Sequence, residues 1–180
     1  MAEGAAAARL FFALWPSPAL QERLAAWAQR AAGEGRAMRA EKLHLTLAFL
    51  GATERVRIPA LIALASEVRF APFRLALDEI GYWKHNRILW CGARAEPAAL
   101  AALVAALRAR LAAARVPFDP KPFVSHVTLV RNAAGPPASP NWIPLAWEAA
   151  DFALIESVQS EGRIEYRRLA RFPAQPDAGH

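Results

Sequence analysis

The sequence predicts an α+β protein with two similar lobes, each containing one β-α-β unit. Apolar stretches of strand length alternate with helical stretches along the chain. The order strand, helix, loop and histidine-containing strand occurs twice, and equivalent positions of the two copies are separated by about 80 residues. If a pseudo-twofold axis relates the copies, their histidine strands face each other across a central cleft. We therefore expect one functional site, formed jointly by both copies.

The first copy shows clearly where its elements begin and end. Residues 9–15 (RLFFALW) form an apolar run of strand length that stops at Pro16. Ser17 is a suitable N-cap for an amphipathic helix that ends near two glycines, and the apolar face of this helix contains Leu20, Leu24 and Trp27. A strand at residues 43–50, terminated by Gly51, completes the copy.

The second copy and the remaining segments show the same kind of pattern. The copy contains a strand at residues 87–93, a helix from Pro97 to residue 115 and a strand at residues 124–131. The segments outside the two copies are predicted to form a helix at 58–68, strands at 73–80, 152–158 and 164–171, and loops at 81–86 and 133–144.

The composition indicates a single domain. The chain has 180 residues, of which 55% are hydrophobic, and we expect one globular domain over residues 1–172 and a flexible tail at 173–180. The single cysteine, Cys91, excludes an intramolecular disulfide and any zinc-ligand spacing, which favours a reducing cytoplasm. No apolar run is long enough to cross a bilayer, and no secretory signal is evident. We expect a cytoplasmic monomer with no membrane partner.

The charge of the chain favours a polyanionic partner. The formal net charge is +6, and long-range attraction draws such a surface toward nucleic acid. A proteome rich in alanine and arginine would produce the same bias. Charge alone therefore does not decide between a nucleic-acid partner and an ordinary basic surface.

The most specific signal is a repeated pair of side chains. Two of the three threonines lie two residues after a histidine, in the sequences His44-Leu45-Thr46 and His126-Val127-Thr128. Side chains alternate between the faces of a strand, so each histidine lies on the same side as its threonine. A lone histidine on a half-buried strand is more often structural than catalytic. The duplication of the His-x-Thr motif favours a functional role.

Two imidazoles and two hydroxyls suit displacement at phosphorus. Imidazole has an ordinary pKa of about 6.5, so near neutral pH one ring can accept a proton while the other donates one. A base that activates the attacking oxygen and an acid that protonates the leaving oxygen each accelerate the reaction by about 10² to 10⁴. Hydroxyl and cationic side chains stabilise the charge on the other phosphate oxygens. This chemistry needs no metal or cofactor, provided that the diester is activated, as a strained 2′,3′-cyclic phosphate is.

Two segments resemble the two-histidine (2H) phosphoesterase superfamily, and within it the family of bacterial and archaeal RNA 2′,3′-cyclic phosphodiesterases, also called 2′-5′ RNA ligases. These segments are residues 42–51, KLHLTLAFLG, and residues 122–131, PFVSHVTLVR. The resemblance covers nearly the whole chain. It implies a bilobal fold in which two antiparallel sheets flank the cleft and helices cover the outside. Relatives carry proline where this chain has Ser125.

The resemblance also implies a reaction and the residues that perform it. His44, Thr46, His126 and Thr128 form the expected catalytic tetrad, which hydrolyses the cyclic phosphate at an RNA end, including ends of tRNA fragments, to a 2′-phosphate. Because the bond to O3′ breaks, we expect His126 to act as base toward water and His44 to act as acid beside O3′. The reverse reaction forms a 2′-5′ linkage.

Other residues are predicted to contact the substrate. Arg131 would bind phosphate, although strict alternation places it opposite His126, so it reaches the cleft only if the strand bulges after Thr128. Phe12, or Phe11 in its place, would stack on a base at the cleft floor. Lys42 would contribute positive charge near the phosphate or be an ordinary solvated lysine. Trp83 and His85 would contact RNA, or belong to a surface turn with no role in binding.

Two other functions fit the same sequence. The main reaction could be 2′-5′ ligation or cleavage, for instance of tRNA halves or short 2′-5′ oligonucleotides. Alternatively, the chain could be an RNA-binding module that retains the fold and uses the cleft only to hold phosphate ends. Turnover of a cyclic phosphate terminus distinguishes these functions.

Overall fold

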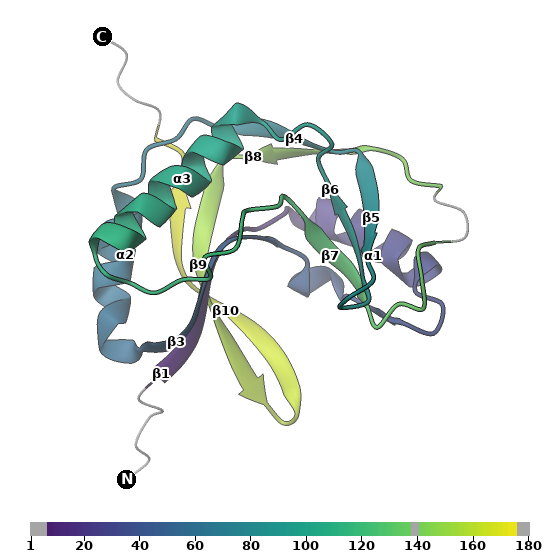
Figure 1. The fold of residues 1–180 in the computed structure, drawn as a ribbon, viewed down its shortest axis with the longest axis horizontal. Coiled ribbons are helices and arrows are strands. Elements are labelled where there is room, and N and C mark those ends of the chain that lie inside the picture. Colours follow the sequence, from purple (N-terminus) through teal and green to yellow (C-terminus); the bar gives the residue numbers. More distant parts are fainter. Residues whose placement is uncertain (1–6, 138–140, 176–180) are drawn as a thin grey trace.

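A computed structural model describes residues 7–137 and 141–175 of the chain. Within these ranges it contains three α-helices, two four-stranded antiparallel sheets and one two-stranded sheet (Figure 1). The four-stranded sheets belong to separate lobes and are flanked by helices. The predicted α+β fold with two antiparallel sheets is therefore confirmed.

The first lobe is built on a sheet with the strand order β10-β9-β1-β3. Strand β1 (Ala7–Leu14) lies inside this sheet and pairs with β3 (Leu45–Glu54) on one side and β9 (Asp151–Ser160) on the other. Strand β10 (Arg163–Pro173) pairs with β9, and together they form a hairpin that extends beyond the body of the lobe (Figure 1).

The second lobe is built on a sheet with the strand order β2-β7-β6-β5. Its strands are β2 (Arg36–Ala37), β7 (Val127–Arg131), β6 (Ile88–Gly92) and β5 (Glu79–Trp83). A separate pair, β4 (Phe73–Leu77) with β8 (Leu145–Ala149), lies along the edge that connects the lobes (Figure 1). Strand β2 and strand β8 were not expected, because β2 is two residues long and β8 follows the proline-rich segment.

The helices exchange partners between the two copies of the repeat. Helix α1 (Pro18–Ala31) follows β1 of the first copy but packs against β2 and β7 of the second lobe. Helix α3 (Ala98–Ala113) follows β6 of the second copy but packs against β3 of the first lobe, beside α2 (Ile58–Ser66). Because α1 and α3 each pack against the lobe that does not contain their preceding strand, they connect the two lobes. None of the helices in the described ranges is both long and apolar enough to cross a bilayer.

Local sequence explains why α1 and α3 begin where they do. The Ser17 hydroxyl accepts a hydrogen bond from the Leu20 amide at 3.3 Å, so the expected N-cap is confirmed. Leu20, Leu24 and Trp27 are all buried, as predicted for the inner face of α1. Pro97 is the N-cap residue of α3, one position earlier than expected for a proline in the first turn.

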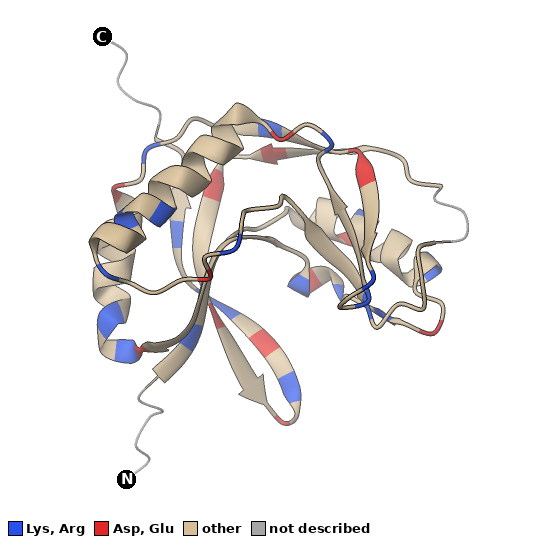
Figure 2. Ribbon diagram, viewed as in Figure 1, with Lys and Arg blue, Asp and Glu red and all other residues tan. Residues whose placement is uncertain are grey.

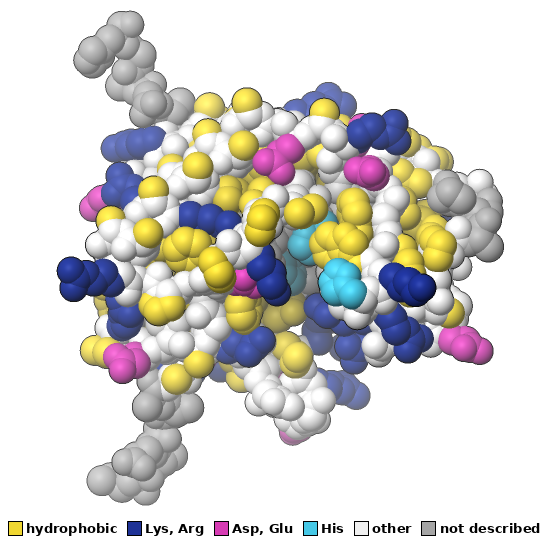
Figure 3. All heavy atoms as spheres, in the orientation of Figure 1, with side chains coloured by type: hydrophobic (Ala, Val, Ile, Leu, Met, Phe, Trp, Pro, Cys, Tyr) yellow, Lys and Arg dark blue, Asp and Glu magenta, His cyan; other side chains and the backbone are white. Residues whose placement is uncertain are grey.

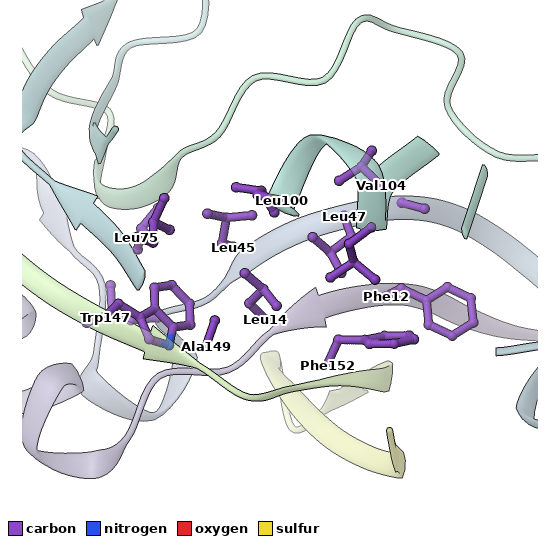
Figure 4. Close-up of a cluster of buried hydrophobic side chains, with 14 of the residues drawn as sticks. Phe12, Leu14, Leu45, Leu47, Leu75, Leu100, Val104, Trp147, Ala149 and Phe152 are labelled. Atoms are coloured by element: carbon purple, nitrogen blue, oxygen red, sulfur yellow. The ribbon is translucent and has the colours of Figure 1, made fainter. Parts of the chain in front are cut away.

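The main core joins both lobes. Side chains on the outer face of the first sheet pack under α3, where Leu100 and Val104 lie over Leu45 and Leu47 (Figure 4). Phe12 lies on this outer face and packs against two further aromatic residues, Phe152 and Phe172, at centroid distances of 6.1 Å. Because this core covers only one face of the first sheet, the other face is left to form the cleft.

Two predicted strands have different ends in the structure. The stretch at residues 73–80 divides at Asp78, whose amide donates to the Gly92 carbonyl and whose carboxylate accepts from the Arg94 amide at 2.8 Å. The chain therefore changes sheets there, and residues 81–83 form β5 instead of a connection. Strand β3 was expected to end at Gly51 but continues to Glu54. Gly51 adopts a φ of +68° at an irregular point of the pairing with β1, and the strand continues beyond it.

The C-terminal tail was expected to begin at residue 173, but residues 173–175 are part of the fold. Strand β10 includes Pro173, the Ala174 amide donates to the Ala150 carbonyl at 2.8 Å, and Gln175 pairs with Phe70. Residues 173–175 are therefore held by backbone hydrogen bonds. Residues 176–180 of the predicted tail, and residues 138–140 of the predicted loop, lie outside the described residues.

Candidate active site

The two His-x-Thr motifs occupy equivalent places in the two lobes. His44 immediately precedes β3 and His126 immediately precedes β7, so each histidine lies just outside the strand in which it was expected. Thr46 and Thr128 are the second residues of these strands. The repeat seen in the sequence is thus a repeat in three dimensions.

A groove of about 350 Å³ lies between the lobes. The first lobe contributes strand residues and the second contributes the β5–β6 turn and the segment before β7; the lining includes Thr46, Phe49, Trp83, His85, Phe123 and His126. Figure 3 shows histidine side chains gathered at a hollow in the middle of this face. The volume is in the range of pockets that hold small organic ligands.

Both catalytic candidates have the same hydrogen bond to the backbone. His44 Nδ1 lies 2.7 Å from the carbonyl oxygen of Lys42, and His126 Nδ1 lies 2.8 Å from that of Val124. A carbonyl oxygen only accepts, so Nδ1 carries the proton in both rings. Each Nε2 is therefore the titrating nitrogen, an acceptor in the neutral ring and a donor in the cation. One ring can take a proton and the other can give one, as general acid–base catalysis requires.

Three aromatic rings surround His44. Trp15 stacks on the imidazole with a centroid distance of 5.3 Å and an interplanar angle of 4°. Phe11 lies 4.9 Å away, and Tyr166 meets the ring edge-on at 5.2 Å. Burial lowers the pKa of His44 from 6.5 to about 4, although the hydrogen bond to the Lys42 carbonyl acts in the opposite direction.

This lowered pKa makes the stability of the fold depend on pH. The unfolded chain protonates His44 below pH 6.5, whereas the folded chain does so only below about pH 4. The free energy of unfolding therefore decreases by about 3 kcal/mol as the pH falls through this window. We expect His44→Phe, which keeps an aromatic ring, to remove this contribution to the loss of stability at low pH. Urea unfolding at the two ends of the window measures it.

The control for this prediction is His85→Phe. His85 is exposed, so the variant should keep the pH dependence of the wild type. Carboxylates contribute equally to all three proteins, so the difference between variants isolates His44. An equal loss of stability in His44→Phe and wild type would contradict the prediction.

His126 has a more open environment. Its ring contacts Trp83 at a centroid distance of 4.6 Å, and burial also lowers its pKa. The charge of His126 also lowers the pKa of His44, by a smaller effect than burial. Because His126 is less enclosed than His44, it is the more readily protonated of the two.

A β-bulge places Arg131 on the cleft side of β7. Two neighbouring residues of β6 pair with Thr128 and Val130, so Leu129 is an extra residue in β7. Leu129 and Val130 are both fully buried, which resets the alternation of side chains. Arg131 therefore lies on the same side of β7 as Thr128. Such a bulge was the condition under which Arg131 was predicted to reach the cleft.

Arg131 has an electrostatic effect on both histidines. Burial has the largest effect on the pKa of His44 and of His126, and the positive charge of Arg131 lowers both further. An anion bound between these groups would interact favourably with all three when they are charged. The site is thus arranged for a negatively charged ligand, and Figure 2 shows further Lys and Arg on elements of both lobes around it.

Backbone contacts hold the segments that precede the two motifs. The buried side chain of Gln21 in α1 donates to the Leu43 carbonyl at 3.2 Å, next to His44. A Cβ atom at Gly92 would collide with the Ser125 carbonyl, so glycine allows β6 to approach the segment before His126. Burial raises the pKa of Glu96, and the backbone of Ser125 acts in the opposite direction.

The prediction that Phe12 binds substrate is wrong. Phe12 is fully buried in the main core, whereas Phe11 lies on the opposite face of β1 beside His44. Both faces of β1 are apolar, so the sequence pattern did not show which phenylalanine faces the cleft. Two further neighbours of His44 were not predicted. Trp15 shares a face with Phe11 by simple alternation, whereas no local signal existed for Tyr166.

The remaining candidates have mixed outcomes. Trp83 and His85 both line the groove. The Lys42 ammonium donates to the Ile164 carbonyl in the β9–β10 hairpin, which anchors the side chain there. Cys91 is fully buried, as expected for a small apolar side chain, and burial raises the pKa of its thiol. Among the described residues, no cluster of histidine, cysteine or carboxylate side chains has the arrangement of a metal site.

Two lobes that each contribute a His-x-Thr motif to a shared groove define the class of two-histidine phosphoesterases. Residues 14–90 match the family model described as "LigT like Phosphoesterase". The RNA 2′,3′-cyclic phosphodiesterase of Escherichia coli (strain K12) is 36% identical over 170 residues, which cover 91% of this chain and 95% of that protein. The chain belongs to the LigT-like phosphoesterase family.

Solved structures agree with this assignment. The crystal structure of E. coli LigT in apo form has a TM-score of 0.82 and 35% identity, and the match covers 95% of this chain and 100% of that one. The complex of E. coli LigT with 3′-AMP has a TM-score of 0.81 and 34% identity, with coverage of 93% and 98%. The expected family and fold are confirmed.

Proposed function

We propose that this protein hydrolyses the 2′,3′-cyclic phosphate at RNA ends to a 2′-phosphate, by acid–base catalysis between His44 and His126. The observation that carries the proposal is the pair of imidazoles, one from each lobe, which lie at equivalent positions before β3 and β7 and each have Nδ1 bound to a backbone carbonyl. The name of the E. coli relative supports this substrate class. The complex of E. coli LigT with 3′-AMP supports a nucleotide in the groove.

Each group in the site has a step in this reaction. One neutral imidazole accepts a proton from water through Nε2 as the water attacks phosphorus. The other, protonated, donates its Nε2 proton to O3′ as the bond between phosphorus and O3′ breaks. The Thr46 and Thr128 hydroxyls and the Arg131 guanidinium stabilise the non-bridging oxygens as their charge increases.

In the free enzyme, the pKa shifts of His44 and His126 favour acid and base roles opposite to those expected from the sequence. Burial holds His44 in its neutral form, which suits a base, whereas the more open His126 is easier to protonate, which suits an acid. We therefore assign His44 as the base and His126 as the acid. Bound phosphate raises the pKa of both rings because a nearby anion stabilises the imidazolium.

A defined RNA terminus tests the proposal. A short RNA that ends in a 2′,3′-cyclic phosphate is incubated with the protein and a chelator, and the product is compared with 2′- and 3′-phosphate standards. We expect a 2′-phosphate, formed at an undiminished rate in the chelator, and the same product from His85→Ala. A 3′-phosphate would overturn the regiochemistry.

The same assay separates the alternatives. Faster formation of 2′-5′-linked products than of phosphate ends, when an RNA with a free 5′-hydroxyl is added, would favour the ligase. Tight binding of the terminus without turnover would favour the RNA-binding module. Because all the site residues come from one chain, we propose that a monomer is active.

The pH dependence follows from the two lowered pKa values. The value of kcat/KM should rise with pH as His44 loses its proton near pH 4, and should fall as His126 loses its proton below its ordinary 6.5. The optimum of kcat/KM is therefore acidic, and that of kcat lies at higher pH because bound phosphate raises both values. Initial rates from about pH 4 to 9 measure both profiles. A rate that is flat across this range would contradict the assignment of two titrating imidazoles.

A further inference from the structure

Arg9 lies on the cleft face of the first sheet, next to the site but outside the tetrad. Alternation along β1 places Arg9, Phe11 and Ala13 on one face, and Trp15 follows on the same side. Phe11 and Trp15 both contact His44. Arg9 therefore lies about 7 Å beyond Phe11 along the strand, in the direction away from Trp15.

The side chain of Arg9 is exposed and supported by an aromatic ring. Its guanidinium carbon lies 4.8 Å from the centroid of Phe49, a residue that lines the groove. Among the described residues, Arg9 has no carboxylate within ion-pair distance. Its charge is thus held at the edge of the groove and is not neutralised.

Tyr166 connects Arg9 to the catalytic residues. Arg9 pairs with Ser157 of β9, and Ser157 pairs with Tyr166 of β10, so all three lie on the same face of the sheet. The Tyr166 ring contacts His44, and the charges of Arg9 and Arg131 both lower the pKa of its hydroxyl, against the effect of burial. The hydroxyl forms no hydrogen bond with another described residue. It is therefore available to a ligand between the two arginines.

We propose that Arg9 and Tyr166 bind the phosphodiester that joins the terminal nucleotide to the preceding one. This inference rests on the proposed function, because it takes the cyclic phosphate to lie between His44 and His126. The next phosphate of the chain is one nucleotide away, and Arg9 lies two residues along β1 from Phe11, which contacts His44. A guanidinium fixed on an aromatic ring donates two parallel hydrogen bonds to such a phosphate. The enzyme would then prefer an RNA end to a free cyclic mononucleotide.

Three substrates test this preference. They are adenosine 2′,3′-cyclic phosphate, the same nucleotide with a 5′-phosphate, and the dinucleotide ApA with a 2′,3′-cyclic phosphate at its 3′ end. For wild type we expect kcat/KM to be about tenfold higher for the dinucleotide than for the nucleoside cyclic phosphate. The 5′-phosphorylated mononucleotide should recover most of this advantage, because it supplies the phosphate without the second nucleoside.

Two variants and a matched control assign the preference to this site. Arg9→Gln should reduce the advantage of the dinucleotide about tenfold, and Tyr166→Phe, which keeps the ring beside His44, should reduce it about threefold. The control is Arg167→Gln. Arg167 is exposed and adjacent to Tyr166 in β10, but alternation places it on the opposite face of the sheet, so the advantage should persist.

The outcomes separate this inference from the function on which it rests. Equal losses on all three substrates in Arg9→Gln would overturn the inference, as would a wild-type enzyme with no preference for the dinucleotide. Hydrolysis of the nucleoside cyclic phosphate in these experiments would leave the proposed function intact. If the wild type hydrolyses none of the substrates, both the proposed function and the inference are wrong.

Discussion

Replacement of His44 or His126 by alanine is expected to lower kcat for hydrolysis of a cyclic phosphate terminus by about 10³-fold. In the proposed mechanism, each variant loses the Nε2 atom that moves a proton, while the threonine hydroxyls and Arg131 still bind phosphate. The double variant should be little worse than either single variant, because the two rings act in one proton-transfer process. Single-turnover rates with saturating enzyme measure the effect on the chemical step.

The control for both variants is His85→Ala. His85 lines the groove with His126 but, among the described residues, has no backbone hydrogen bond of the kind that orients the two candidate catalytic rings, so its removal should change kcat by less than about threefold. A loss of about 10³ in His85→Ala would show that the groove uses a different histidine.

A substrate with a good leaving group identifies the acid. A p-nitrophenyl diester of a nucleoside phosphate releases p-nitrophenolate, which needs no proton. On this substrate we expect His126→Ala to lose only about tenfold, whereas His44→Ala still loses about 10³-fold because water must be activated. The opposite pattern would restore His44 as the acid and His126 as the base.

Replacement of Arg131 by glutamine is expected to lower kcat/KM about 100-fold. Arg131 lies on the same side of β7 as Thr128, and its positive charge lowers the pKa of both imidazoles. Arg131→Lys should recover part of the loss, because it restores the charge without the two parallel hydrogen bonds. Steady-state kinetics on the cyclic phosphate terminus measure both variants.

Arg131→Gln should also shift the pH profile. Removal of a nearby positive charge raises the pKa of His44 and His126, so both limbs of the kcat/KM profile should move to higher pH. Arg30→Gln, at the exposed end of α1, is the control and should change neither rate nor profile. A loss of rate in Arg131→Gln without a shift in pH dependence would place the guanidinium farther from the histidines than we infer.

Features that depend on short stretches of sequence were predicted well. The N-cap at Ser17 and the apolar face of α1 follow from residues within a few turns of one helix. The His-x-Thr motifs and their duplication predicted a site made from two lobes, because the side-chain period of a strand is local. The same period showed that Arg131 could reach the cleft only if β7 bulges after Thr128, and the pairing of β7 with β6 has this bulge.

Features that depend on partners distant in sequence were decided only by the tertiary structure. The assignment of Phe11 to the cleft and Phe12 to the core required the sheet that covers one face of β1. Similarly, the bulge at Leu129 arises from pairing with β6, and the exchange of helices arises from packing between lobes.

The sequence by itself determined the family, the two motifs and the three helices, because each of these is encoded in neighbouring residues. The tertiary structure decided the roles within the site. Trp15, directly after β1, and Tyr166 in β10 enclose His44 from positions that are far apart in the chain, and this burial lowers its pKa. A pKa depends on what surrounds a group in space, and only the folded chain determines those surroundings.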